Sequence, residues 1–339
     1  MSEIQVLSWV QAVRKRPAMY FGDVRDGTGL LHAVRFAFGG AMDQFIAGHA
    51  STIQVSVGVD GVVEVEDDGR GIPAFTRTGQ SLSILEGAVT NWMTSHMSGG
   101  EIPFVVGAWN YGGNTGLVSA VSSVFEIEST HAGERLRLCC ARGEVIERTP
   151  LGTSSTRGTR VRFLLDEAIF EGRVTPALVA DLITETAWLH PRLSLVWQGE
   201  VLANEGGIEA WTRLRGKGEL DDDFVFATSL QHGESTVDVA LGWLHPAREG
   251  ETLRAFVNSQ PTSSEVVMPG VREGLRRVAL DADSDRITLG LIGAVHVTQR
   301  DARAPVDALV ADAIACALPG ALEANPAARA RFLARARGK

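Results

Sequence analysis

The sequence predicts an α+β protein, because helix-like and strand-like hydrophobic spacings alternate along it. Helical spacing, with apolar residues three and four positions apart, marks Thr28–His49 and Ser81–Met97. Alternation at every second position, as in a half-buried strand, marks five runs: Ile53–Val59, Val62–Glu66, Phe125–Glu128, Arg135–Cys139 and Arg160–Leu164. Helices mixed with mainly antiparallel strands are typical of the α+β class.

An acidic, turn-prone stretch divides the rest of the chain. Before it, the spacing predicts a helix at Leu178–His190, a short strand at Ser194–Trp197 and one further segment at Gly207–Leu214. The stretch itself is Glu219–Asp223, and adjacent like charges resist packing, so we interpret it as a linker. We therefore expect a first domain over residues 1–218 and a second over residues 219–339.

The second domain is expected to be a strand-rich α/β unit of ordinary domain size. Its predicted elements are strands at Val237–Trp243, Leu253–Asn258 and Thr288–Val297, and helices at Gly270–Leu280 and Val306–Leu318.

Composition restricts the class of protein. With 339 residues, 45% of them hydrophobic, the chain can form two ordinary cores. A formal net charge of −9 gives no overall attraction to phosphate polymers, so strong nucleic-acid binding is not expected. Cys139, Cys140 and Cys316 indicate a reducing compartment, because a vicinal pair cannot form an ordinary disulfide. Without an apolar signal core or a run of about 18 apolar residues, we expect a cytoplasmic protein with no membrane span.

Four short motifs follow one another in the N-terminal part of the chain. They are Arg14–Asp23 (RKRPAMYFGD) followed by Asp26–Leu30 (DGTGL), Asp67–Pro73 (DDGRGIP), Gly112–Gly116 (GGNTG) and Gly158–Phe163 (GTRVRF). In this order and spacing they resemble the gyrase B and topoisomerase IV B family of GHKL ATPases. The resemblance implies a GHKL (Bergerat) ATP-binding sandwich followed by a transducer domain of ribosomal-protein-S5-like α/β fold.

Two of these motifs indicate a ligand site. A strand ends at Glu66, so the carboxylate of Asp67 can point into a pocket opened by the glycine-rich turn, although Asp-Gly-Arg-Gly is also an ordinary turn sequence. By resemblance, Asp67 accepts the adenine amino hydrogen, and the glycine loop of the third motif holds phosphate on its backbone N–H groups. The ligand- or nucleotide-binding residues implied in this way are Asp67, Arg70, Gly71, Ile72, Pro73, Gly112, Gly113, Gly116 and Thr159.

The family pattern breaks in the helix after Gly29. Aligned without gaps, the general-base glutamate of the family falls on Phe36, and its magnesium-binding asparagine falls on Gly40. A phenyl ring cannot accept a proton from water, and glycine has no side chain to hold a cation. We therefore expect ATP hydrolysis and the magnesium site to be lost.

Further departures affect the same pocket. Val118 stands where the family has another glycine, and Glu101 stands where it has a lid lysine. Gly39 and Gly40 are adjacent inside the predicted helix, where each costs on the order of 1 kcal/mol of helix stability relative to alanine. This cost indicates a kink in the helix or a need for space beside it. We expect a larger and less polar cavity, with neutral decay as the alternative. The residues expected to remodel the pocket are Phe36, Gly39, Gly40, Glu101, Trp109 and Val118.

His32 lies one turn before Phe36 and matches a histidine that, in the family, supports the missing glutamate. It is either a new acid or base, acting with Asp67 as a catalytic pair, or a hydrogen-bonded structural histidine.

We interpret the chain as a degenerate, stand-alone gyrase-B-like protein whose former nucleotide pocket binds, and in one version transforms, another small molecule. One alternative is a regulatory or decoy protein that pairs with gyrase or topoisomerase subunits. Another is a topoisomerase-like domain with weak residual ATP binding. The partners considered are a small molecule in the pocket, a second copy of the chain or a gyrase subunit. No cofactor is expected apart from weakly bound ATP.

Overall fold

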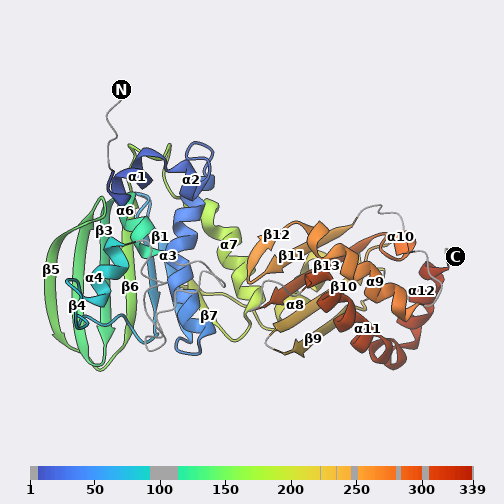
Figure 1. Cartoon of the computed structure of the whole chain (residues 1–339). Coiled ribbons are helices and arrows are strands. Elements are labelled where there is room, and N and C mark those ends of the chain that lie inside the picture. The colour runs from blue at the N-terminus through green and yellow to red at the C-terminus, as the bar shows by residue number, and fades with distance from the viewer. Residues whose placement is uncertain are drawn as a thin grey trace. The chain divides into compact units, whose positions relative to one another are not determined.

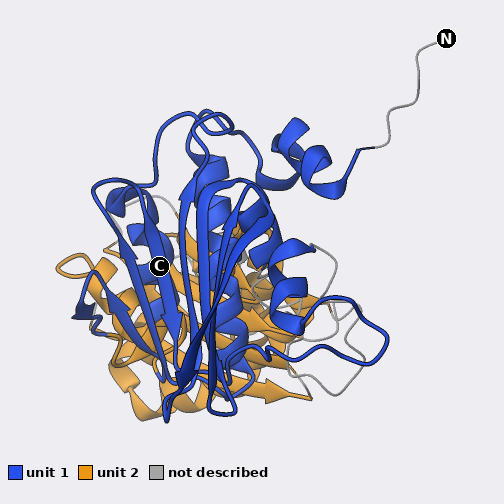
Figure 2. Ribbon diagram, turned by 90° about the vertical axis from the view of Figure 1, so that its left-hand side faces the viewer, with its two compact units in different colours: residues 1–187, 192–203 blue, residues 188–191, 204–339 orange. Residues whose placement is uncertain are grey.

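The protein consists of two compact units, seen in a computed structural model that describes residues 7–91, 114–221, 223–233, 235–245, 251–279, 284–299 and 305–337. Unit 1 comprises Met1–Ala187 and Arg192–Ala203, and unit 2 comprises Trp188–Pro191 and Asn204–Lys339 (Figure 2). This division by contacts falls earlier than the expected boundary after residue 218, because the segment from Gly207 packs within unit 2.

Unit 1 is built on a twisted eight-stranded sheet with the order β5-β4-β3-β6-β2-β1-β7-β8 (Figure 1). Neighbouring strands are antiparallel except for β1 and β7. The strands are β1 Thr52–Val57, β2 Val63–Asp67, β3 Ser122–His131, β4 Glu134–Ala141, β5 Glu144–Thr153, β6 Gly158–Leu165, β7 Ser194–Trp197 and β8 Glu200–Val201. The helices are α1 Trp9–Lys15, α2 Ala18–Phe21, α3 Thr28–Ile46, α4 Ile84–Thr90, α6 Thr115–Ala120 and α7 Pro176–Leu189.

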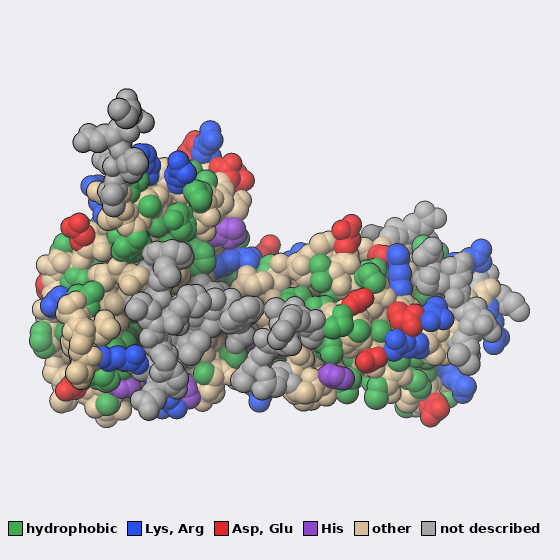
Figure 3. Space-filling view, in the orientation of Figure 1, with side chains coloured by type: hydrophobic (Ala, Val, Ile, Leu, Met, Phe, Trp, Pro, Cys, Tyr) green, Lys and Arg blue, Asp and Glu red, His purple; other side chains and the backbone are tan. Residues whose placement is uncertain are grey.

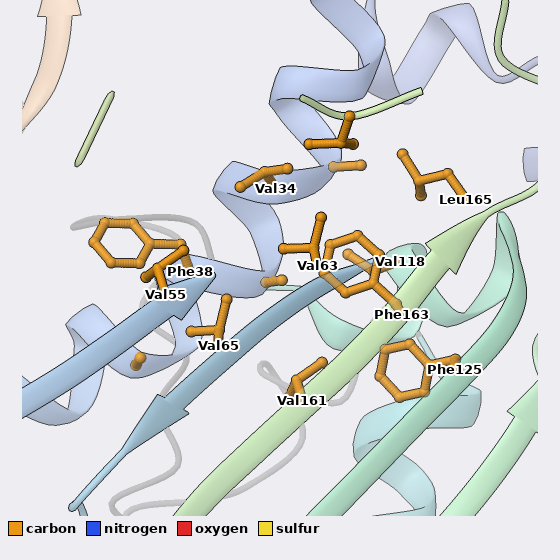
Figure 4. Packing of buried hydrophobic residues seen from close by; sticks show 14 of the residues in the cluster. Val34, Phe38, Val55, Val63, Val65, Val118, Phe125, Val161, Phe163 and Leu165 are labelled. Atoms are coloured by element: carbon orange, nitrogen blue, oxygen red, sulfur yellow. The ribbon is translucent and has the colours of Figure 1, made fainter. Parts of the chain in front are cut away.

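Helix α3 forms the centre of the unit 1 core. The backbone N–H of Thr28 donates to the carboxylate of Asp26 at 2.8 Å, which satisfies one free donor of the first turn. Val34 and Phe38, one turn apart, face the inward-pointing side chains of β1 and β2, among them Val55, in Figure 4. Alternation along β2 leaves Glu64 and Glu66 on the opposite face of the sheet, so one face carries the helices and the core.

Unit 2 is a five-stranded sheet with the order β12-β11-β13-β10-β9. Its strands are β9 Phe226–His232, β10 Ser235–Trp243, β11 Thr252–Val257, β12 Gln260–Thr262 and β13 Leu291–Thr298. Its helices are α8 Gly207–Arg215, the 3-10 turn η1 Ser264–Val266, α9 Met268–Val278, α10 Ser284–Ile287, α11 Val306–Ala324 and α12 Pro326–Ala336. Val237, Val239 and Leu241 alternate along β10 and are buried in one cluster with apolar residues of α9 and α11.

The visible surface of unit 2 mixes the two charge signs (Figure 3). On α9, Glu273 bonds Arg276 at 2.8 Å and Arg277 at 2.9 Å, and Arg277 also bonds Asp312 of α11 at 2.8 Å. Exposed pairs of this kind contribute little stability, but they interrupt any basic stripe on the described part of this face. In the ranges that the structure describes, we find no helix with the length and hydropathy needed to traverse a lipid bilayer.

Strands β2 and β6 approach each other so closely that Gly158 has no room for a side chain. Its φ is +134°, and a Cβ placed there would lie 2.0 Å from the carbonyl oxygen of Asp67. Gly152 on β5 also has a positive φ, +83°, but a Cβ there would meet nothing within 4 Å.

We predict that Gly158→Ala lowers the free energy of unfolding by about 3 kcal/mol or more, because it combines backbone strain with a clash against backbone. Gly152→Ala should cost only about 1 kcal/mol, since it adds strain alone. Urea unfolding curves of the two variants and the parent protein measure this difference. Equal losses for both variants would contradict the close approach of β2 and β6.

Candidate functional site

A small cavity lies between helix α3 and the inner face of the unit 1 sheet. Its volume is about 30 Å³, and the described residues that line it are Ala37, Gly40, Ala41, Gln44, Val65, Asp67, Ile72, Thr115, Thr159 and Val161. Four of these, Gly40, Asp67, Ile72 and Thr159, are among the site residues predicted from the sequence. The cavity therefore brings four of the predicted site residues together.

Asp67 is the ionisable side chain among the described residues that line this cavity. It ends β2 directly opposite Thr159 of β6, and only 7% of it is exposed. One carboxylate oxygen accepts the backbone N–H of Gly69 at 2.8 Å. Burial raises the pKa of Asp67 to about 7, while hydrogen bonds from the backbone of Gly69 and Thr159 act in the opposite direction. The carboxyl can thus change its protonation state near neutral pH.

The rest of the DDGRGIP motif holds backbone in place. Gly71 has a φ of +70°, and a Cβ there would lie 2.1 Å from the carbonyl oxygen of Thr130. The hydroxyl of Ser129 accepts the N–H of Ile72 at 2.5 Å and donates to its carbonyl oxygen at 3.0 Å. These contacts fix the turn that follows Asp67. Gly71 and Ile72 therefore serve the structure of this turn.

Arg70 and Pro73 are not among the lining residues of the cavity. The Arg70 side chain is exposed, and its backbone N–H donates to the side-chain oxygen of Gln44 at 3.1 Å. Pro73 is buried, and its carbonyl oxygen accepts the N–H of Leu85 at 3.0 Å. Both residues support the loop around the pocket.

Phe36 and Gly40 occupy the two positions at which hydrolysis was expected to fail. The half-buried ring of Phe36 packs edge-on against Phe21, with centroids 5.5 Å apart. Apart from its neighbours in α3, no atom of the described residues lies within 4 Å of a Cβ placed at Gly40. Neither residue offers an oxygen ligand, and the described residues contain no group of three His, Cys, Asp or Glu placed to hold a metal ion. The residues present therefore do not fit the magnesium site of the family.

The cavity is small, whereas the sequence led us to expect an enlarged one. Val118 is fully buried in the core, where Figure 4 places it beside Phe163. The ring of Phe36 packs against the ring of Phe21. Neither Val118 nor Phe36 lines the cavity, and nor does Gly39, which is buried on α3. Of the described residues expected to remodel the pocket, only Gly40 therefore lines the cavity.

The glycine loop is described only at its end. Gly112, Gly113, Glu101 and Trp109 lie outside the described residues. Gly116, on α6, is buried, and a Cβ there would lie 2.8 Å from the carbonyl oxygen of Asn91. Close packing between α4 and α6 therefore accounts for this glycine. Asn114 caps α6 by accepting the N–H of Leu117 at 2.9 Å.

His32 has a structural partner. Its Nδ1 lies 2.7 Å from the carbonyl oxygen of Phe21, which ties α3 to the end of α2. His32 is not among the lining residues of the cavity, so the structure does not bring it together with Asp67 there. The contact agrees with the structural interpretation of this histidine.

Sequence reasoning missed two polar lining residues, Gln44 and Thr115. Gln44 lies four residues after Gly40 on α3, so helical spacing from Gly40 could have found it. Thr115 lies inside the Gly112–Gly116 motif, which could have found it, and its hydroxyl donates to the carbonyl oxygen of Ala88 at 2.8 Å.

A second hollow of about 320 Å³ lies among polar side chains of the same sheet, and Asp67 and Thr159 line it as well. Its charged residues are largely paired with each other or with neighbours: Arg135 contacts Glu128, and Arg160 bonds Glu64 at 2.6 Å. Although it is larger, its walls carry carboxylates and guanidinium groups of both signs without an arrangement that selects one ligand. The inner cavity therefore remains the candidate site.

Comparison with known proteins agrees with the motifs, although no family model matches the chain. The DNA gyrase B protein of Thermus thermophilus is 33% identical over 280 residues, which are 77% of this chain and 42% of that protein. The DNA gyrase B protein of Campylobacter jejuni is 32% identical over 292 residues, 82% of this chain and 36% of that protein. The chain thus spans well under half the length of these relatives.

Solved structures give the same result. The 43K ATPase domain of Thermus thermophilus gyrase B, in complex with an aminocoumarin, has a TM-score of 0.79 at 25% identity, covering 96% of this chain and 93% of that one. The gyrase B protein of Myxococcus xanthus has a TM-score of 0.76 at 22% identity, covering 96% and 99%. These likenesses confirm the fold class and the resemblance predicted from the sequence.

We predict that titration of Asp67 makes the protein less stable as pH rises. Its folded pKa of about 7 lies above the ordinary aspartate value, so the folded state holds a proton that the unfolded chain has released. The stabilisation is complete below about pH 4 and is lost as pH rises through about 7, by on the order of 4 kcal/mol.

Unfolding free energies of the parent and Asp67→Asn, measured from pH 4 to 8, test this difference. The loss should disappear in Asp67→Asn and persist in Glu66→Gln, which alters the neighbouring exposed carboxylate. Parallel curves for the parent and Asp67→Asn would show that Asp67 titrates normally.

Proposed function

We propose that this chain, which is a relative of DNA gyrase B with the fold of its 43K ATPase domain, binds a small molecule in the former nucleotide pocket and does not hydrolyse ATP. The observation that carries the proposal is the pair Phe36 and Gly40. One places a ring packed on Phe21 where the reaction needs a base, and the other leaves no ligand for a metal ion.

The recognition half of the pocket supports binding. Asp67 and Thr159 sit opposite each other at the ends of β2 and β6, held there by the glycine contacts of the turn. A carboxyl with a pKa of about 7 can accept an N–H when ionised and donate an O–H when neutral. The ligand class that fits is therefore a planar group with an amino or amide N–H directed at Asp67.

The size of the cavity limits how such a ligand enters. About 30 Å³ is far below the ~300–1,000 Å³ of typical ligand pockets, so binding has to widen this site. We expect the wall to yield beside Gly40, because, apart from its neighbours in α3, no atom of the described residues lies within 4 Å of a Cβ placed there. The Thermus thermophilus fragment was solved with an aminocoumarin, so this fold accepts a ligand other than a nucleotide.

A second candidate function is pairing with one of the subunits of a type II topoisomerase. It is favoured by the extent of the likeness, since the 43K gyrase B domain covers 96% of this chain and thus both units. A protein that retains this much of the fold without turnover could occupy the place of an active gyrase B protein. Inhibition of gyrase supercoiling by stoichiometric amounts of the chain would support this function, and no effect at tenfold excess would remove it.

We predict that the purified chain shows no magnesium-dependent ATP hydrolysis above that of Asp67→Asn. In calorimetry, a non-hydrolysable ATP analogue should bind weakly or not at all, and magnesium should change its affinity less than about twofold, because phosphate and metal contacts are missing. An aminocoumarin should bind through Asp67, and Asp67→Asn should weaken it about tenfold, as expected for one hydrogen bond to a charged group.

Glu66→Gln serves as the control for that comparison, since Glu66 points away from the inner cavity. Tight, magnesium-dependent nucleotide binding or genuine turnover would refute the loss of hydrolysis. If Asp67→Asn leaves the affinity for the aminocoumarin unchanged, the proposed ligand contact is refuted.

A further inference from the structure

Unit 2 contains a polar cluster that the gyrase resemblance does not explain. Strand register places Ser229, Asp238 and His296 side by side across β9, β10 and β13. Val237 and Val239 point into the helix-covered core, so Asp238 between them points to the other face of the sheet. His296 is only 2% exposed there.

Ser259 joins this row from the turn between β11 and β12. Val257 pairs with Gln260, which makes Asn258 and Ser259 the two central residues of a hairpin turn. Both have positive φ, +49° and +60°. Glycine is favoured at the second of these positions, so a serine there costs about 1 kcal/mol of backbone strain. Backbone strain of this kind is concentrated at functional sites, where the side chain takes part in binding or catalysis.

The distances connect these groups in a chain. The Ser259 hydroxyl lies 3.1 Å from Nε2 of His296 and 2.8 Å from Nε2 of His190. Nδ1 of His296 lies 3.4 Å from a carboxylate oxygen of Asp238, which is long for a hydrogen bond and acts as an electrostatic contact. The two imidazole rings pack edge-on with centroids 5.6 Å apart. Thr298 adds a hydroxyl 3.3 Å from Nε2 of His296.

Proton positions follow from the partners. Burial pushes the pKa of Asp238 upward, but its contacts with His296 and Ser229, together with the nearby His190, outweigh burial and hold this pKa below the ordinary value. Asp238 is therefore a carboxylate at neutral pH and favours a proton on Nδ1 of His296. With the ring proton of His296 on Nδ1, its Nε2 presents a lone pair to the hydroxyl of Ser259, and His190 can donate to the same oxygen.

We propose that this cluster is a reactive site in which Ser259 is the nucleophile, His296 its base and Asp238 the group that orients the base, and that it accepts acyl or phosphonyl groups from small activated esters. The order of atoms, carboxylate to Nδ1 and Nε2 to hydroxyl, is the one that activates serine in hydrolases of unrelated folds. Catalytic contacts are commonly long before a ligand binds, which suits the 3.4 Å separation.

The step balances within the cluster. Oγ of Ser259 forms a bond to the carbonyl carbon of the ester, and its proton moves to Nε2 of His296. The bond from that carbon to the leaving oxygen then breaks, and the leaving oxygen takes the proton from His296 as an alcohol or phenol. With a fluorophosphonate, Oγ bonds to phosphorus, fluoride leaves, and the proton passes through His296 to water.

The test treats the full chain with p-nitrophenyl acetate and, separately, with a fluorophosphonate, followed by intact mass and peptide mapping. One adduct is expected, on Ser259. Ser259→Ala should abolish it, and His296→Gln should slow its formation about 100-fold or more, the usual contribution of a general base. Asp238→Asn should slow it as well, because the base loses its orienting charge.

Two variants serve as controls. Ser235→Ala removes a hydroxyl on β10 that is similarly buried, at 7% exposure against 5% for Ser259, and should react like the parent. Glu66→Gln, which removes an exposed carboxylate of unit 1, should also react normally. Circular dichroism and melting curves check that each variant folds.

The parent protein alone decides the outcome if His296→Gln does not fold. No adduct on Ser259 of the parent, or adducts spread over several serines at similar rates, would overturn the proposal. So would a folded His296→Gln variant that reacts as fast as the parent.

Discussion

The closeness of two backbone segments at the ends of β2 and β6 determines the geometry of the unit 1 pocket. Gly158 and Gly71 leave no room for a Cβ against the carbonyl oxygens of Asp67 and Thr130, at 2.0 and 2.1 Å. These strands cannot move apart or shift by one residue without losing their pairing. The pairing therefore holds the carboxyl of Asp67 at the inner cavity. Its burial there, rather than a neighbouring charge, is the main cause of its raised pKa.

Hydrolysis and recognition depend on different elements in this architecture. In the function that we propose, recognition depends on the sheet and its turn, where backbone contacts leave no room for side chains at Gly71 and Gly158. The positions expected to serve hydrolysis lie on α3, where Phe36 packs on Phe21 and a Cβ at Gly40 would meet none of the described residues beyond its helix neighbours within 4 Å. A helix surface tolerates such exchanges because side chains, not main chain, surround it. The pocket can therefore change its chemistry while its walls keep their positions.

Much of the fold could be predicted from periodicity, and the exceptions have physical reasons. Strand β5 was not expected, because it is an edge strand with little burial and its alternation is interrupted at Pro150. In the site, motif order located Asp67 and Thr159, but the small volume and the contact of His32 with Phe21 depend on tertiary packing. The cluster at Ser259 unites residues far apart in the sequence, so no local pattern could show that His190, Asp238 and His296 meet.

The path of the chain between the units has a consequence for how the protein is made. Trp188–Pro191 belongs to unit 2, yet the next residues, Arg192–Ala203, return to unit 1 and supply β7, which pairs in parallel with β1. During synthesis, the large sheet cannot complete itself before the ribosome has also released the first piece of the other unit. A single cut in the chain therefore cannot separate the two units as complete fragments. Expressing each unit alone requires removing or replacing the segment Trp188–Pro191.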